Sequence, residues 1–182
     1  MAELKATKVT LNDGSPCVIR SAYDHDAAEL NAYLNAVGGE SPYLEFGADD
    51  YYISEAEELN VIRLLFAAEN SILLVAVAAE EIVGTLTVQG GRAPRMRHHA
   101  WLGVNVARDY WGMGVGRLLM KIALRWAESN PTLRKIHLLV RHDNGRAIDL
   151  YEKFGFIQEG RLTRMLHADG QFHDSLCMGR EV

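Results

Sequence analysis

The sequence is poor in cysteine and has no long hydrophobic run, and both absences narrow its class. Only two cysteines, Cys17 and Cys177, occur in 182 residues, and they lie at opposite ends of the chain in apolar contexts. This placement fits neither a disulfide framework nor paired metal ligands, so we expect reduced thiols in the core and no bound metal. No apolar stretch approaches the roughly 18 residues that span a membrane. We therefore expect no membrane partner.

The chain also lacks an excess of positive charge and a secretory leader. Its 19 lysines and arginines against 24 aspartates and glutamates leave a formal net charge of -5. That balance argues against a broad phosphate-binding surface, so we expect no nucleic-acid partner. The first residues, MAELKATKV, show no basic start followed by an apolar stretch, which predicts a cytoplasmic protein.

Internal repeats and low-complexity linkers are absent as well. Hydrophobic residues make up 48% of the chain and charged residues 24%, which is typical of a globular protein. The length is close to that of one average domain. We therefore expect residues 1–182 to form a single domain.

Hydrophobic spacing and turn residues predict a mixture of strands and helices. The expected elements are strands at 8–11 and 17–21, helices at 24–37 and 54–69, strands at 72–79, 82–88 and 100–107, a helix from 115 to about 130, a strand at 136–140 that is buried on both faces, a helix that ends at Gly155, and two strands around Asp169-Gly170. Their order is β-α-α-β-β-β-α-β-α-β-β. This order predicts an α+β fold, a mixed sheet with helices on its faces.

The most informative segment joins strand 100–107 to the next helix. It reads VNVARDYWGMGVGRL from Val104 to Leu118, with three glycines at alternate positions. Such a turn leaves backbone amides uncovered at the helix N-terminus, where an anion is the natural ligand. Alternate glycines also form plain tight turns, so these residues alone favour a functional and a structural role equally.

Two nucleotide-binding motifs fit this segment poorly. A P-loop requires Gly-Lys followed by Ser or Thr, whereas Gly116 is followed by Arg117 and Leu118. A dinucleotide fold places its glycine loop after the first strand with the spacing G-x-G-x-x-G, whereas several strands precede this turn. A nucleotide-binding domain therefore remains a distant alternative.

Two motifs resemble the GNAT superfamily of acyl-CoA-dependent N-acyltransferases. In that family an apolar strand is followed by Arg or Gln, two residues, Gly, one residue, and Gly or Ala at the start of a helix; here Trp111 stands where Arg or Gln is usual. The downstream pattern is matched by Asn144, Ala147, Tyr151, Gly155 and Phe156. The resemblance is nearest to the branch of amino-acid and ribosomal-protein N-acetyltransferases. It implies a central, mostly antiparallel mixed sheet flanked by helices.

The resemblance also implies acetyl-CoA as the co-substrate. Its pantetheine arm is expected to pair with the strand Val104, Asn105 and Val106, and its pyrophosphate to lie on the amides of the glycine turn. The residues expected at the cofactor are Val104, Asn105, Val106, Trp111, Gly112, Met113, Gly114, Val115, Gly116, Arg117, Asn144 and Tyr151. Asn144 precedes a helix, so it is expected to serve as an N-cap as well.

Tyr151 is the expected catalytic acid, because the family places a tyrosine here against the sulfur. A phenol of pKa about 10 can donate to a thiolate of pKa about 8.5. The alternative is that Tyr151 only fills the apolar face of its helix. His98 and His99 are weak candidates for the base, since paired histidines near arginines often form a solvated turn. The expected base is a water relay, in which Asn105 orients a water.

The loop at 40–53 is expected to line the approach of the acceptor amine. Tyr43 and Glu45 of this loop are expected to contact the acceptor, as is Asn105. The acidic residues Glu45, Asp49 and Asp50 would attract a cation, and the alternative is a merely solvated acidic loop. Arg164 in the closing hairpin is expected to meet a carboxylate. The expected partners are a small-molecule amine or a peptide or protein N-terminus, with a homodimer common among relatives. The alternative function is a non-catalytic acyl-CoA-binding module.

Overall fold

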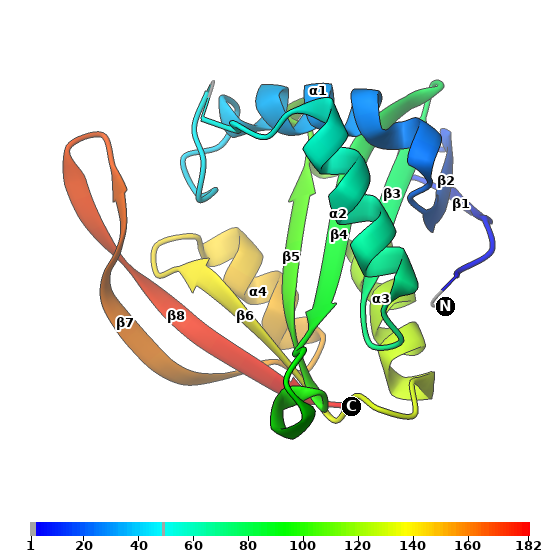
Figure 1. Cartoon of the computed structure of the whole chain (residues 1–182). Coiled ribbons are helices and arrows are strands. Elements are labelled where there is room, and N and C mark those ends of the chain that lie inside the picture. Colours follow the sequence, from blue (N-terminus) through cyan, green and yellow to red (C-terminus); the bar gives the residue numbers. More distant parts are fainter. Residues whose placement is uncertain (1–2, 49) are drawn as a thin grey trace.

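A computed structural model describes residues 3–48 and 50–182 (Figure 1). Asp49, which belongs to the expected acidic loop, lies outside the described residues. The elements in chain order are β1 (Thr7–Thr10), β2 (Pro16–Ser21), α1 (Ala27–Gly38), α2 (Glu55–Ala67), β3 (Ile72–Ala78), β4 (Glu81–Gly90), β5 (His99–Val106), α3 (Val115–Ser129), β6 (Lys135–Arg141), α4 (Gly145–Lys153), β7 (Ile157–Ala168) and β8 (Gln171–Glu181).

The strands form one eight-stranded sheet in the order β1-β2-β3-β4-β5-β6-β8-β7. Neighbouring strands are antiparallel except β5 and β6, which are parallel. The predicted mixed, mostly antiparallel sheet with flanking helices is therefore confirmed. The first β in the expected order corresponds to two strands, β1 and β2, which form a hairpin joined by the turn at 12–15.

Helices cover the sheet on both faces, α1 and α2 on one face and α3 and α4 on the other (Figure 1). Successive side chains of a strand point to opposite faces. In β3, Leu74 packs in the core beneath α3, whereas Leu73 and Val75 pack beneath α1 and α2. The continuous apolar sequence of β3 thus follows from burial on both sides.

Strand β6 differs from this pattern, and its expected burial on both faces is wrong. Ile136, Leu138 and Val140 are buried, but the alternating residues His137 and Leu139 are only half-buried. The reason is that β6 packs on α3 and α4 through one face, while α1 and α2 lie over the β3–β4 side of the other face (Figure 1).

Local signals in the sequence account for the ends of two helices. Ser54 begins α2 as an N-cap, and the Glu57 carboxylate accepts a 2.7 Å hydrogen bond from the Ser54 backbone N–H. Asn144 begins α4, and its Oδ1 accepts from the Ala147 N–H at 3.2 Å. Gly155 ends α4 with φ of +79°. These contacts fix the start of α4 against the site described below.

The structure bears on the expected absence of a membrane span and on the expected burial of the two cysteines. No helix in the described part of the chain is long and apolar enough to cross a membrane. Both cysteines are free thiols; Cys17 is buried, but Cys177 is only half-buried on β8. The expectation that both thiols lie in the core therefore holds for Cys17 alone.

Candidate active site

The site begins where β5 and β6 separate. The two strands pair over only three positions, His99–Trp101 against Lys135–His137, and then diverge. A cavity of about 1400 Å³ occupies this part of the molecule. It is lined by β5, the glycine turn, α4, the loop at 40–53 and the inner sides of α1 and α2. The divergence of two parallel strands thus creates the room for a ligand.

Strand β5 offers unpaired backbone groups to this opening. The His99 C=O accepts from the Gly91 N–H and the Ala107 N–H donates to the Val83 C=O, both at 3.0 Å, so the odd-numbered residues of β5 bond to β4. In an antiparallel pair the intervening residues direct their backbone groups the other way. Val104 therefore presents its N–H and C=O to the cavity, beyond the last pairing with β6.

The Asn105 side chain is held on the α1 side of the sheet. Its Oδ1 accepts hydrogen bonds from Tyr33 Oη at 2.8 Å and from Thr85 Oγ1 at 2.9 Å. Burial raises the pKa of Tyr33, so this phenol remains a donor. Asn105 Nδ2 has no acceptor among the described residues and is the group left for a water or a ligand.

The glycine turn is fixed by backbone conformation and by one residue of the first hairpin. Gly112 and Gly114 have φ of +83° and +92°, a region that strains residues with a side chain. Asn12, in the turn between β1 and β2, donates its N–H to the Met113 C=O at 2.9 Å and its Nδ2 to the Gly112 C=O at 2.8 Å. Asn12 also lines the cavity, a role that its place in a predicted turn did not indicate.

Not every amide of the turn is open, which corrects the expectation for two residues. The Trp111 N–H donates to the Arg108 C=O at 3.0 Å, and the Met113 N–H donates to the Tyr110 C=O at 3.3 Å. Met113 does not line the cavity. The amides without an acceptor among the described residues are those of Gly112, Gly114, Val115, Gly116 and Arg117. They form the uncovered N-terminus of α3.

Trp111 contributes through its side chain instead. Its Nε1 donates to the Val106 C=O at 2.6 Å, which closes the end of β5. The guanidinium groups of Arg108 and Arg146 lie over its ring, 5.7 and 5.5 Å from the centroid. The indole thus makes cation–π contacts with two guanidinium groups beside the glycine turn.

Tyr151 projects from α4 into the same cavity. It is 7% exposed, and burial raises the pKa of its phenol to about 12. No described residue accepts from or donates to its hydroxyl. A buried phenol without a protein partner is available to a group bound in the cavity. Asn144, Gly145 and Arg146 line the cavity beside it.

The loop at 40–53 reaches the cavity through Tyr43 and Glu45, as expected. The Arg141 guanidinium lies 4.5 Å from the Tyr43 ring centroid and is also paired with Asp143 at 2.6 Å. Arg164, in contrast, lies outside the cavity. Its guanidinium lies 5.4 Å from the Phe172 ring centroid, on β8.

The two histidines considered as bases do not reach the site either. Neither His98 nor His99 lines the cavity. Both ring nitrogens of His99 are buried without a hydrogen-bond partner among the described residues, and its ring packs edge-on against His137 at 5.3 Å between centroids. The expected water relay for the base remains a prediction.

A buried carboxylate in the cavity was not anticipated. Glu58 on α2 is 1% exposed and lines the cavity, and its Oε2 accepts from Tyr51 Oη at 2.6 Å. The signal was present in the sequence, because Glu58 stands four and seven residues before Ile62 and Leu65, on the buried face of α2. A charged residue on an apolar helical face indicates either a pairing partner or a functional site.

Comparison with known proteins identifies the family. Residues 40–156 match the acetyltransferase (GNAT) family. The chain belongs to this family. It is 32% identical over 107 residues to an L-amino acid N-acetyltransferase of Escherichia coli, an alignment that covers 59% of this chain and 66% of that protein.

Solved structures agree with this assignment. The crystal structure of a GNAT-family acetyltransferase from Streptococcus pneumoniae superposes with a TM-score of 0.88 at 32% identity, covering 91% of this chain and 99% of that one. A Salmonella typhimurium protein solved with its cofactor acetyl-CoA shares the fold, with a TM-score of 0.79 at 17% identity over 91% and 93% of the two chains.

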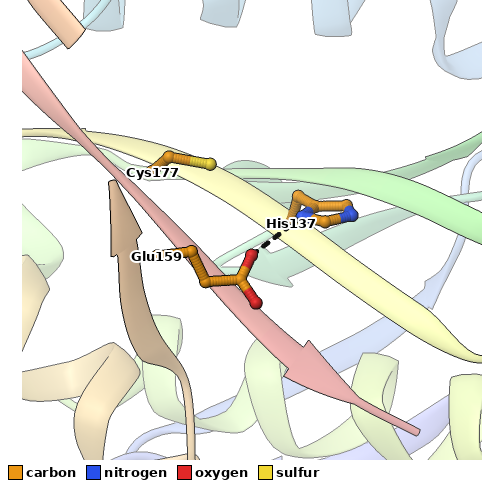
Figure 2. A group of neighbouring side chains, drawn as sticks. All are labelled: His137, Glu159 and Cys177. Carbon is orange, nitrogen blue, oxygen red and sulfur yellow. Dashed lines mark ion pairs between the residues drawn. The ribbon is translucent and has the colours of Figure 1, made fainter. Parts of the chain in front are cut away.

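Outside the cavity, the described residues include one cluster of side chains that are common metal ligands. Figure 2 shows His137, Glu159 and Cys177, whose ligand atoms lie within 4.8 Å of one another. The Glu159 carboxylate is already paired with Lys135 and lies 3.4 Å from His137 Nδ1. Glu159 Oε1 faces Lys135 and Oε2 faces His137, so contacts within the chain account for this arrangement.

Glu58 allows a prediction on stability. Burial raises the pKa of Glu58 above its usual 4.5, so ionisation costs more in the folded than in the unfolded chain. The carboxyl therefore stabilises the fold fully only below the unfolded pKa, and this contribution is lost as the pH rises through the folded pKa. Glu58→Gln is expected to raise Tm at pH 7 by roughly 2–4 °C, the effect of about 1 kcal/mol. The gain should disappear near pH 4; an equal gain at both pH values would contradict it.

Proposed function

We propose that the protein transfers an acetyl group from acetyl-CoA to a primary amine by direct attack, without a covalent enzyme intermediate. The observation that carries this proposal is that two sets of backbone groups without hydrogen-bond partners line the same cavity. These are the free edge of β5 at Val104 and the five open amides from Gly112 to Arg117. One array suits an extended amide-containing arm, and the other suits its pyrophosphate.

The distribution of charge in the cavity supports the same orientation. From α3 and α4 the cavity is lined by three cations, Arg117, Arg146 and Lys153, and by one carboxylate, Asp149. The carboxylates of Glu45 and Glu58 line it from the loop at 40–53 and from α2. A polyanionic co-substrate therefore fits the α3–α4 end and a cationic acceptor the α1–α2 end, although the net charge of the chain is -5.

The chemistry requires three proton movements besides the transfer itself. The acceptor ammonium must lose a proton, for which we propose a water held by Asn105 Nδ2. The amine nitrogen then forms a bond to the thioester carbonyl carbon while the Val104 N–H stabilises the developing oxyanion. As the C–S bond breaks, Tyr151 Oη donates its proton to the departing thiolate. The second amine proton returns to the phenolate through water, so that amide, thiol and one released proton result.

Acetyl-CoA is expected to stabilise the protein against heat. At 100 times its dissociation constant a ligand adds about 2.7 kcal/mol, which corresponds to a rise in Tm of roughly 5–11 °C for a chain of this size. ATP and NAD serve as controls and should leave Tm unchanged. Thiol release with acetyl-CoA should follow on adding one of a panel of amines, amino acids and N-terminal peptides. A Tm shift without thiol release across the panel would favour the non-catalytic acyl-CoA-binding module.

A further inference from the structure

Two buried carboxylates in the described chain have very different surroundings. Asp26, 2% exposed, forms two hydrogen bonds with the Arg20 guanidinium, at 2.6 and 2.8 Å, and accepts the Tyr23 N–H at 2.7 Å. Glu58, 1% exposed, has one phenol donor and no cation within ion-pair distance among the described residues. Burial of an unpaired carboxylate is costly, and the cost is removed when a cation binds beside it.

The wall around Glu58 is apolar and aromatic. The cavity-lining side chains that share one hydrophobic cluster on this side include Leu30, Leu34, Leu65, Leu73, Phe46 and Tyr51. The rings of Phe46 and Tyr51 lie 5.1 Å apart between centroids. Such a chamber has room for a hydrocarbon body and for one positive charge at its buried carboxylate. The other carboxylate on this side of the cavity, Glu45, is exposed to solvent.

We propose that Glu58 binds the acceptor through a cationic amino group, and that the preferred acceptor is a primary amine with one ammonium group on an alkyl or aryl body. The inference rests on the proposed acetyl transfer, whose acceptor it specifies. The alternative role for the Tyr51–Glu58 hydrogen bond is only to attach the loop at 40–53 to α2. A glutamine at 58 separates the two roles, because its amide oxygen still accepts from Tyr51 while the negative charge is lost.

Two arginines that line the cavity differ in their partners. Arg141 is neutralised by Asp143 and also donates to the Pro42 C=O at 2.8 Å. Arg92 lines the cavity from the segment after β4 and pairs with no described carboxylate. It is the group that an acceptor carboxylate would meet, so amino acids are included in the test.

Glu58→Gln is expected to raise KM for 2-phenylethylamine or hexylamine by roughly 10- to 100-fold, the usual value of a charge-assisted contact. The kcat and the dissociation constant for acetyl-CoA should change less than about twofold. Glu58→Asp, which keeps the charge, should restore part of the affinity. Glu55→Gln is the matched control: the same change on an exposed residue of the same helix, expected to leave every constant unchanged.

The experiment includes direct calorimetric binding of both amines to the full chain, so that it does not depend on turnover. Weaker binding or a higher KM in Glu58→Gln, with a Tm at or above that of the wild type, supports the inference. Wild-type constants in Glu58→Gln, a fall in kcat alone, or no binding of either amine by the wild type overturns it. Preference for spermidine or for amino acids over both monoamines also overturns the proposed acceptor class. Failure of acetyl-CoA binding, in contrast, would contradict the proposed function.

Discussion

Gly114→Val is expected to raise the dissociation constant for acetyl-CoA by at least about 100-fold. Gly114 has φ of +92°, which a β-branched residue adopts only under strain of about 1–3 kcal/mol. An added Cβ would also lie 3.1 Å from Asn12 Oδ1, and Asn12 holds the turn through Gly112 and Met113. Relief of the strain must move the turn, and with it the amides that converge on the anion.

Gly170→Val provides the matched control for backbone strain. Gly170 has φ of +73°, lies in the turn between β7 and β8, and has open space where its Cβ would be. Both variants should lose stability, but only Gly114→Val should lose acetyl-CoA binding in a titration followed by calorimetry. Normal binding by Gly114→Val, or an equal loss in both variants, would show that the turn does not hold the co-substrate.

Local sequence signals predicted most of the fold. The capping box at Ser54, the N-cap at Asn144 and the glycine stop after α4 each depend on a few neighbouring residues, and the structure contains all three. The half-buried face of β6 could not be predicted in the same way. Whether a strand face is covered depends on where helices from distant parts of the chain lie, and apolar runs carry no information on that.

The same distinction between local signals and distant contacts applies to the candidate site. The glycine turn and Tyr151 line the same cavity, and both were predicted from residues and from the family resemblance. The use of the Met113 amide within the turn was not predictable, because it depends on the exact turn geometry. Arg164 lies outside the cavity, within a segment where the register of β7 against β8 shifts between Leu162 and Leu166, and such an irregularity was not predictable from the sequence.

Tyr151→Phe is expected to lower kcat roughly 100-fold, at the lower end of general acid catalysis, and to leave KM for acetyl-CoA nearly unchanged. The reason is that the variant removes one oxygen and keeps the ring, which packs 6.0 Å from Phe156 between centroids. Because no described residue bonds to the hydroxyl, its loss breaks no contact of the fold, and Tm should stay within about 2 °C.

The raised pKa of the Tyr151 phenol predicts how kcat depends on pH. With a pKa of about 12, the phenol stays protonated through the range in which the amine becomes nucleophilic. The kcat of the wild type should therefore show no alkaline decline up to about pH 10, since loss of the acid would begin only near the phenol pKa.

Tyr23→Phe, which removes an exposed hydroxyl bonded to Glu3 outside the cavity, is the matched control for Tyr151→Phe. If Tyr151→Phe keeps kcat within twofold of the wild type in a thiol-release assay with a good acceptor, Tyr151 is not the acid, and its place on the apolar face of α4 is sufficient to explain it.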